Sequence, residues 1–222
     1  MSALMANILL GVTGSVAAVK TPLLYSRLKS LGHSVKVVAT QAALYFFNPV
    51  AIEPLNPPPP ERNPAVVVLD EDEWPGRADG RRYQGGDDVP HIALRRWADL
   101  LLIAPLDANT LAKLSAGLAD NCLTCVWRAW DSERPVLLAP AMNTLMWRHP
   151  LTARCLRQLA LDAGAPAAPP ALREDDLVDW INENCRRLRI AAPESRRLAC
   201  GDVGVGALAN PDALAALVQS LI

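Results

Sequence analysis

The segment Pro140–Trp147 carries an amide side chain at a position where an α/β protein could hold a ligand. It reads Pro-Ala-Met-Asn-Thr-Leu-Met-Trp and follows the apolar, strand-like run Val136–Ala139. Open α/β sheets bind ligands just beyond the carboxyl ends of their strands. Core packing explains the two Met and the Trp, but not Asn143, whose short amide can hydrogen-bond a planar anion or a ring edge. We therefore predict that Asn143 contacts a ligand.

Two other residues are candidates for proton transfer. His91 begins a predicted helix, 91–98, where the helix dipole favours a neutral imidazole that could act as base or donor. A helix-start histidine bonded only to water is the alternative. Cys200 lies in the glycine-rich segment 199–209, which could form a mobile flap and present a thiol as proton donor. A buried structural cysteine is equally compatible with the sequence.

We expect no catalytic role for the remaining histidines or for the Cys-x-x-Cys pair. His33 and His149 are expected at the surface. Cys122 and Cys125 have metal-like spacing, but no second pair accompanies them, and we interpret both as core thiols. We predict no metal site.

A tight turn, Gly11-Val-Thr-Gly-Ser15, stands between a predicted strand and a predicted helix. Glycines let the backbone approach a phosphate, a helix N-terminus offers free N–H groups, and Thr13 and Ser15 add hydroxyls. The dinucleotide pattern Gly-x-Gly-x-x-Gly is missing, and the second strand ends Val38-Ala39-Thr40 without an acidic residue. A mononucleotide phosphate fits better than NAD, and a tight turn without a ligand is the alternative.

Polar residues also gather after the buried strand expected at 100–104. Asp107, Asn109 and Thr110 stand where a helix begins, and helix capping requires only one of them. Together they could supply donors and acceptors to the pyrimidine edge of an isoalloxazine ring. Phe46 could stack on such a ring, although ordinary core packing is the alternative.

Strands that alternate with helices would bring these candidates together. The pattern predicts an α/β fold with one doubly wound parallel sheet. A proline-rich surface loop is expected at 54–64, and a long mobile loop at 70–90. Strands are expected at 7–12, 34–39, 66–69, 100–104 and 136–139, and helices at 15–31, 91–98, 108–118, 121–130, 150–163 and 211–221, with a part-helical stretch at 172–189.

Composition limits the possible partners and the compartment. The chain has 222 residues, is 51% hydrophobic and carries a formal net charge of −1. With no long basic run, nucleic acid and anionic membrane surfaces are poor partners, and no apolar window is long enough to span a membrane. The five cysteines lack a disulfide framework spacing, so free thiols in a reducing, cytoplasmic setting are expected.

Five motifs together resemble the eukaryotic type of phosphopantothenoylcysteine decarboxylase, within the homo-oligomeric flavin-containing cysteine decarboxylases. The resemblance covers about residues 7–221, and the pairing of the Asn motif with the Cys motif is its most specific part. The motifs are Gly11-Val-Thr-Gly-Ser15, Pro90-His-Ile-x-Leu-Arg-Arg-Trp-Ala-Asp99, Ala104-Pro-Leu-Asp-Ala-Asn-Thr110, Pro140–Trp147 and Ala199-Cys-Gly-Asp-x-Gly-x-Gly-Ala207.

The resemblance implies a flavodoxin-like (Rossmann-like) fold, FMN and a homotrimer with sites between subunits. His91 would be the active-site histidine, as base or orienting group, Asn143 would hold the substrate carboxylate, and Cys200 would donate a proton late. Met146 and Gly201 would also contact the substrate. FMN would be bound by Gly14, Ser15, Thr40, Phe46, Asp107, Ala108, Asn109, Thr110, Ala141 and Met142.

The implied reaction converts 4'-phosphopantothenoyl-L-cysteine to 4'-phosphopantetheine and CO2 in coenzyme A biosynthesis. Oxidation of the substrate thiol to a thioaldehyde would create the electron sink for CO2 loss, and re-reduction would follow. A peptidyl-cysteine decarboxylase and a non-catalytic, phosphatase-regulatory relative of the same fold are the alternatives. The chain departs from the family pattern in its proline-rich loop and in an expected insertion at about 171–195, within a single flavoprotein domain, 1–222.

Overall fold

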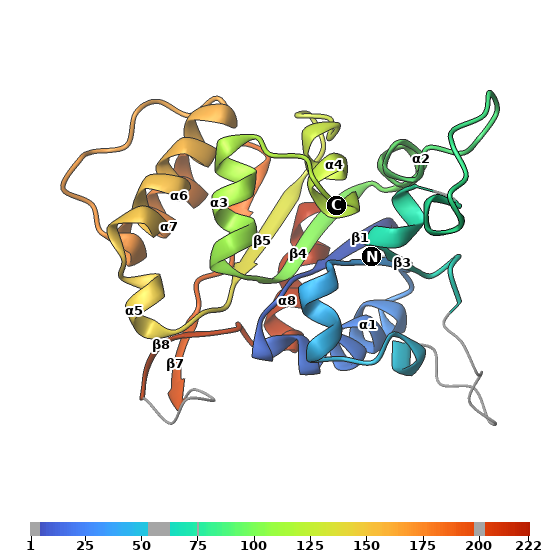
Figure 1. Ribbon diagram of the computed structural model, residues 1–222. Helices are drawn as coiled ribbons and strands as arrows, with labels where there is room; N and C mark the ends of the chain where they lie inside the picture. The colour runs from blue at the N-terminus through green and yellow to red at the C-terminus, as the bar shows by residue number, and fades with distance from the viewer. Residues whose placement is uncertain (1–4, 53–62, 75, 198–202) are drawn as a thin grey trace.

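A six-stranded parallel sheet forms the centre of the molecule (Figure 1). The computed structural model describes residues 5–52, 63–74, 76–197 and 203–222. The strand order is β3-β2-β1-β4-β5-β6, and every neighbouring pair is parallel. The strands are β1 (Asn7–Val12), β2 (Ser34–Ala39), β3 (Val67–Leu69), β4 (Leu100–Leu106), β5 (Val136–Pro140) and β6 (Leu188–Ile190).

Helices cover both faces of this sheet and bury a separate apolar core on each (Figure 1). One core packs α1 (Thr21–Ser30) and α8 (Pro211–Leu221) against alternate strand residues such as Leu10 and Leu102. The other core uses the opposite strand faces. It packs the helices α2 (Pro90–Trp97), α3 (Ala108–Ala116), α4 (Cys122–Arg128), α6 (Pro150–Asp162) and α7 (Glu174–Asn184).

The predicted doubly wound parallel sheet is confirmed. The order reverses between β1 and β4, because β2 and β3 lie on one side of β1 while β4, β5 and β6 follow on the other. Such a switch point leaves a crevice beyond the carboxyl ends of the strands, which is where doubly wound proteins bind ligands. The fold therefore directs attention to the segments that follow β1, β4 and β5.

The helix expected at 15–31 is two elements in the structure. A 3-10 helix, Val16–Lys20, comes first, and α1 then begins with Pro22 in its first turn. Proline lacks an N–H and is tolerated where that group would have no partner in the helix. Pro22 thus marks the true start of the α-helix.

Residues 171–195, where we expected an insertion, contribute to the sheet and to its core. They include the edge strand β6 and α7. The residues Leu177, Val178 and Ile181 of α7 are buried in the core that also contains α3 and α6. A two-stranded antiparallel hairpin follows, made of β7 (Glu194–Arg197) and β8 (Val203–Ala207). Most of the expected proline-rich loop lies outside the described residues.

His33 is buried, so the expectation of a surface position is wrong. Its side chain is 2% exposed, and Nδ1 accepts a hydrogen bond from the Ala6 amide at 3.3 Å. Burial lowers the pKa of the imidazole, an effect only partly offset by Gln219. His149 is exposed as expected and caps α6. Among the described residues, no helix is long and apolar enough to cross a membrane.

Candidate cofactor and substrate site

A cleft of about 560 Å³ opens beyond the carboxyl ends of β1, β4 and β5. Its walls come from the turn after β1, the start of α3, the turn after β5 and the end of β8. Most of the residues that we predicted to bind cofactor or substrate line this cleft: Gly14, Ser15, Phe46, Asp107, Ala108, Asn109, Ala141, Met142, Asn143 and Met146.

The turn after β1 is held by hydrogen bonds between the ends of β1 and β4. The Thr13 hydroxyl donates to the Pro105 carbonyl at 2.8 Å and accepts from the Asp107 amide at 2.7 Å. Thr13 therefore positions the backbone and is not the phosphate donor that we expected. Ser15 caps the following 3-10 helix, with its Oγ accepting from the Ala17 amide.

Gly14 occupies a position where a side chain does not fit. A Cβ atom there would lie 2.7 Å from the Ala42 Cβ and 3.1 Å from Asp107 Oδ2. Real Cβ contacts are almost never as short as the first of these distances, so the turn would have to move. The glycine thus keeps the end of β1 close to the start of α3, where the cleft begins.

The start of α3 contributes polar groups of two kinds. Asp107 is the N-cap, and its Oδ1 accepts from the Thr110 amide at 2.7 Å. Asn109 is the second residue of the helix, is exposed and lines the cleft. Capping therefore accounts for Asp107, as anticipated for one member of this group, whereas Asn109 is available to a ligand.

Asn143 lines the cleft and also has a structural role that the sequence interpretation did not include. It caps the short helix α5 (Thr144–Trp147), with its Oδ1 accepting from the Leu145 amide at 2.8 Å. Asn143 is half-buried. Met142, which precedes it, is 9% exposed, and Leu145, two residues after it, is exposed. The cap orients the Asn143 amide, because its Oδ1 already accepts a hydrogen bond from the backbone of α5.

The β7–β8 hairpin closes one side of the cleft through close glycine contacts. The Met142 amide donates to the Gly206 carbonyl at 2.9 Å. A Cβ on Gly206 would lie 2.1 Å from the Met142 carbonyl oxygen, and one on Gly204 would lie 2.4 Å from Thr144 Oγ1. Glycine at both positions lets β8 lie directly on the turn that carries Asn143.

Two predicted cofactor residues do not line the cleft. Thr110 is 2% exposed and contributes its amide to the Asp107 cap. Thr40 is 6% exposed at the end of β2, and its Oγ1 is a buried oxygen without a hydrogen-bond partner. An orphaned buried hydroxyl beside a ligand cleft is a group that a bound molecule could satisfy.

Sequence reasoning missed part of the lining. Lys20 lies near the turn after β1 and adds a positive charge to the cleft, and Leu208 follows β8 across the molecule. The charge of Lys20 could have been noticed at the end of the 3-10 helix. Leu208 carries no local signal, because only the path of β8 brings it to the cleft. The other missed lining residues are Val16, Ala17, Val19, Gly206 and Ala207.

His91 lies elsewhere in the chain, and it does not line the cleft. Its Nδ1 hydrogen-bonds Glu73 Oε1, and the ligand atoms of His91, Glu73 and Cys125 all lie within 4.8 Å of one another. Burial, followed by the Glu73 carboxylate, raises the pKa of the Cys125 thiol and of the neighbouring Cys122 thiol. Both thiols are therefore neutral at ordinary pH.

Cys200 and Gly201 lie outside the described residues, so their predicted roles stay predictions. The segment that contains them, 198–202, connects β7 to β8.

The cleft suits a flat aromatic group with a polar edge and a phosphate. Apolar side chains such as Val19, Phe46 and Met146 can face a ring, while Asn109 can meet its polar edge. Ser15, the backbone beside it and Lys20 can meet an anion. These donors fit a mononucleotide such as FMN, and the orphaned Thr40 hydroxyl agrees with a ligand bound nearby.

Comparisons with known proteins show the family of the chain. The family model described as Flavoprotein matches residues 3–222. The chain is 42% identical over 217 residues to phosphopantothenoylcysteine decarboxylase of Mus musculus, covering 97% of this chain and 87% of the relative. It is 39% identical over 213 residues to the Arabidopsis thaliana enzyme of the same name, covering 96% and 83%.

Solved structures give the same picture. A PPC decarboxylase cysteine-to-serine mutant complexed with pantothenoylaminoethenethiol superposes with a TM-score of 0.74 at 37% identity, covering 98% of each chain. The FMN binding protein AtHal3 superposes with a TM-score of 0.69 at 39% identity, covering 97% of this chain and 95% of that one.

Proposed function

The chain belongs to the flavoprotein family, and from this premise we propose that it is an FMN-dependent carboxy-lyase. Its substrate would be 4'-phosphopantothenoyl-L-cysteine, converted to 4'-phosphopantetheine and CO2 in coenzyme A biosynthesis. The observation that carries the proposal is one cleft lined by both the Gly14–Ser15 turn and Asn143. Relatives that match almost the whole chain bear the name of this activity.

The chain's own residues would bind FMN at the switch point of the sheet. The Gly14–Ser15 turn and Lys20 would hold the phosphate, Phe46 would face the ring, and Asn109 would hydrogen-bond its polar edge. Bound FMN would supply the two-electron oxidation of the substrate thiol that makes loss of CO2 possible. The apolar walls of the cleft would keep water away from the reacting group.

Asn143 would bind the substrate carboxylate and fix its direction. Because Oδ1 caps α5, the amide NH₂ is the part of Asn143 suited to a carboxylate. Met146 would provide an apolar contact at the same end of the cleft, with Gly201 close to the substrate. Cys200 would protonate the carbon that lost CO2, which is adjacent to the sulfur-bearing carbon, at the end of the reaction.

A homotrimer would explain why His91 lies apart from the cleft of its own subunit. We propose that His91 reaches the cleft of a neighbouring subunit, so that each site is formed by two chains. The partly exposed ring of His91 agrees with this arrangement. The described cysteines are free thiols, which agrees with a reducing, cytoplasmic setting.

The direct test of the function is a visible spectrum combined with a turnover assay on the purified protein. We expect flavin absorbance bands, and release of CO2 with a lighter product after addition of 4'-phosphopantothenoylcysteine. A protein that cannot take up FMN would refute the cofactor assignment. Flavin bands without turnover would instead favour a regulatory relative or another cysteine-ended substrate, such as a peptide.

Asn143→Asp separates carboxylate binding from folding. Aspartate also caps helices well, so α5 should persist. The added negative charge would repel the substrate carboxylate, and we expect turnover to be abolished while FMN stays bound. The exposed Asn184→Asp is the matched control and should keep normal turnover. Full activity of Asn143→Asp would remove Asn143 from carboxylate binding.

Cys200→Ser tests the final proton transfer. We expect CO2 to be released, but the product should retain its carbon–carbon double bond, and flavin absorbance should stay bleached. The complex of a relative's cysteine-to-serine mutant with pantothenoylaminoethenethiol supports this expectation. Mass spectrometry of the product is the measurement, and an ordinary saturated product would end the assignment of Cys200.

A further inference from the structure

We propose that Glu73 is a positioning residue for His91. Its carboxylate accepts the Nδ1–H hydrogen bond and leaves Nε2 as the nitrogen that meets the substrate. This inference rests on the proposed function, in which His91 is the catalytic histidine. It adds a residue that none of the sequence motifs singled out.

The contact between the two side chains carries the proposal. Glu73 Oε1 and His91 Nδ1 are hydrogen-bonded, although the residues are 18 positions apart in the chain. The Glu73 side chain is 1% exposed and that of His91 is 21% exposed. The carboxylate is therefore enclosed, whereas the imidazole lies between the protein interior and the surface.

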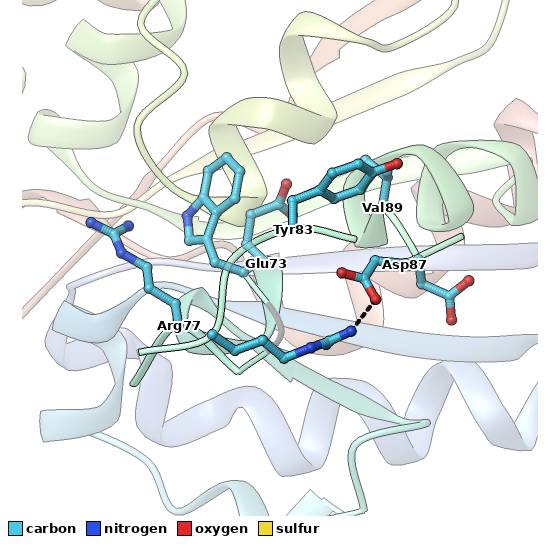
Figure 2. A pocket seen from close by; sticks show the side chains of 8 residues that line it. Glu73, Arg77, Tyr83, Asp87 and Val89 are labelled. Carbon is cyan, nitrogen blue, oxygen red and sulfur yellow. Dashed lines mark hydrogen bonds and ion pairs between the residues drawn. The ribbon is translucent and has the colours of Figure 1, made fainter. Parts of the chain in front are cut away.

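The surroundings of Glu73 hold its carboxylate in place. Glu73 ends a 3-10 turn, Asp70–Glu73, that follows β3, and the turn contacts both α2 and α4. It lines a hollow of about 320 Å³ formed by the following loop. Figure 2 shows Glu73 in this hollow together with Tyr83 and Val89. An enclosed carboxylate on a turn that packs against both helices can orient a ring that it touches.

The imidazole needs such a partner to act as a directed base or donor. The two ring nitrogens differ, and the hydrogen bond made by one decides which form the other takes. With Nδ1–H bound to Glu73, Nε2 has no hydrogen-bond partner among the described residues. The same logic relates the carboxylate to the histidine in hydrolase triads, where the acid orients the ring without contacting the substrate.

The neighbouring thiols are more consistent with a hydrogen-bonded Glu73–His91 pair than with a metal site. Glu73, His91 and Cys125 form a donor set that zinc accepts, and zinc would bind the thiol as thiolate. Burial and the Glu73 carboxylate both raise the pKa of the Cys125 thiol, which opposes that form. Of these two neighbours, His91 is the one that is hydrogen-bonded to the Glu73 carboxylate.

The test combines nuclear magnetic resonance with kinetics on the FMN-loaded protein. The chain has three histidines, so ¹⁵N-histidine labelling gives few signals, and His91→Gln identifies the signal of His91. At alkaline pH we expect His91 to be the Nδ1–H tautomer in the wild type and to lose this preference in Glu73→Ala. We also expect kcat to fall about 10-fold or more in Glu73→Ala, because positioned acid–base catalysis is worth roughly 10²–10⁴-fold.

Several controls keep the test decisive. KM and the flavin spectrum should stay close to wild type, and Glu73→Gln, which keeps the shape, should recover part of the lost kcat. Cys125→Ser should change neither the tautomer nor kcat. An unchanged tautomer or an unchanged kcat in Glu73→Ala would overturn the proposal. A Cys125→Ser variant that reproduces the Glu73→Ala defect would overturn it in favour of a metal-bound cluster.

Failure of the proposed function gives a different result. If His91→Gln turns over normally, His91 is not catalytic and the inference falls with that role, even if the tautomer measurement detects the pair. If His91→Gln is inactive but Glu73→Ala is fully active, the decarboxylase assignment stands and only the positioning role of Glu73 is wrong.

Discussion

The cleft and the Glu73–His91 pair are built in different ways, although both lie on the same sheet. The cleft is shaped by backbone turns, with Gly14 and Gly206 at positions that exclude a side chain. The pair depends on side chains from separate elements, because Glu73 follows β3, His91 starts α2 and Cys125 belongs to α4. The first region is made to admit a ligand, and the second to hold one ring in place.

The two regions also differ in their ionisable groups. Burial raises the pKa of Asp70, Cys122 and Cys125, which all lie around the pair. The cleft instead gathers neutral groups, one cation, Lys20, and the carboxylate of Asp107, which caps α3. Changes in the cleft should therefore alter ligand binding, whereas changes around the pair should alter turnover or the pH dependence of stability.

Gly206→Ala should produce the largest effect of the cleft variants. Its Cβ would lie 2.1 Å from the Met142 carbonyl oxygen, at a φ of +143° that favours glycine. Strain and overpacking together should cost about 2 kcal/mol or more of folding free energy. Displacement of β8 should reduce turnover about 100-fold, the scale for small misplacements in active sites. Thermal unfolding and initial rates are the measurements.

Gly85→Ala is the matched control for this prediction. No atom lies within 4 Å of a Cβ built on Gly85. Stability and turnover should therefore stay near wild type. If Gly206→Ala behaves like Gly85→Ala, β8 does not pack on the Asn143 turn as described.

Gly14→Ala should act on cofactor binding more than on turnover. The new Cβ would press on Ala42 and on the Asp107 carboxylate, and would shift the turn that meets the phosphate. We expect FMN affinity to fall about 10-fold, which corresponds to about 1.4 kcal/mol. Excess FMN should restore most of the turnover. Flavin fluorescence titration measures the affinity, and an unchanged value would exclude this turn as the phosphate site.

Local sequence signals predicted the cleft better than the pair. The turn after β1 and the bounds of α8 were predicted from a few adjacent residues. The buried strands were also predictable, because apolar and β-branched runs bounded by turns carry their own signal. What these features share is that the residues involved are neighbours in the chain.

The remaining features depend on contacts that no local pattern encodes. β6 is three residues long within a charged stretch, so it was not predicted as a strand. The packing of β8 on the Met142–Asn143 turn joins segments about 60 residues apart, which chain periodicity cannot indicate. His33 was expected at the surface because it follows a helix end, yet tertiary packing buries it. The pairing of Glu73 with His91 likewise appears only in the folded chain.

Asp70→Asn should produce the smallest effect and tests the electrostatic side of the comparison. Burial raises the pKa of Asp70, while its hydrogen bond from the Gln41 amide partly opposes this. The folded state then binds more protons than the unfolded state above the ordinary Asp value near 3.9. Stability from this group is present below that value and is lost as pH rises through the folded pKa.

The stability of Asp70→Asn relative to wild type should therefore rise as the pH increases above about 4. The change with pH is the quantity to measure, by urea unfolding at several pH values, because the substitution also disturbs the contact with Gln41. Exposed Asp99→Asn is a poor control, since Asp99 accepts from the Asn7 amide, and exposed Asp179→Asn is preferable. If the difference in unfolding free energy between Asp70→Asn and wild type does not change with pH, burial does not raise the pKa of Asp70.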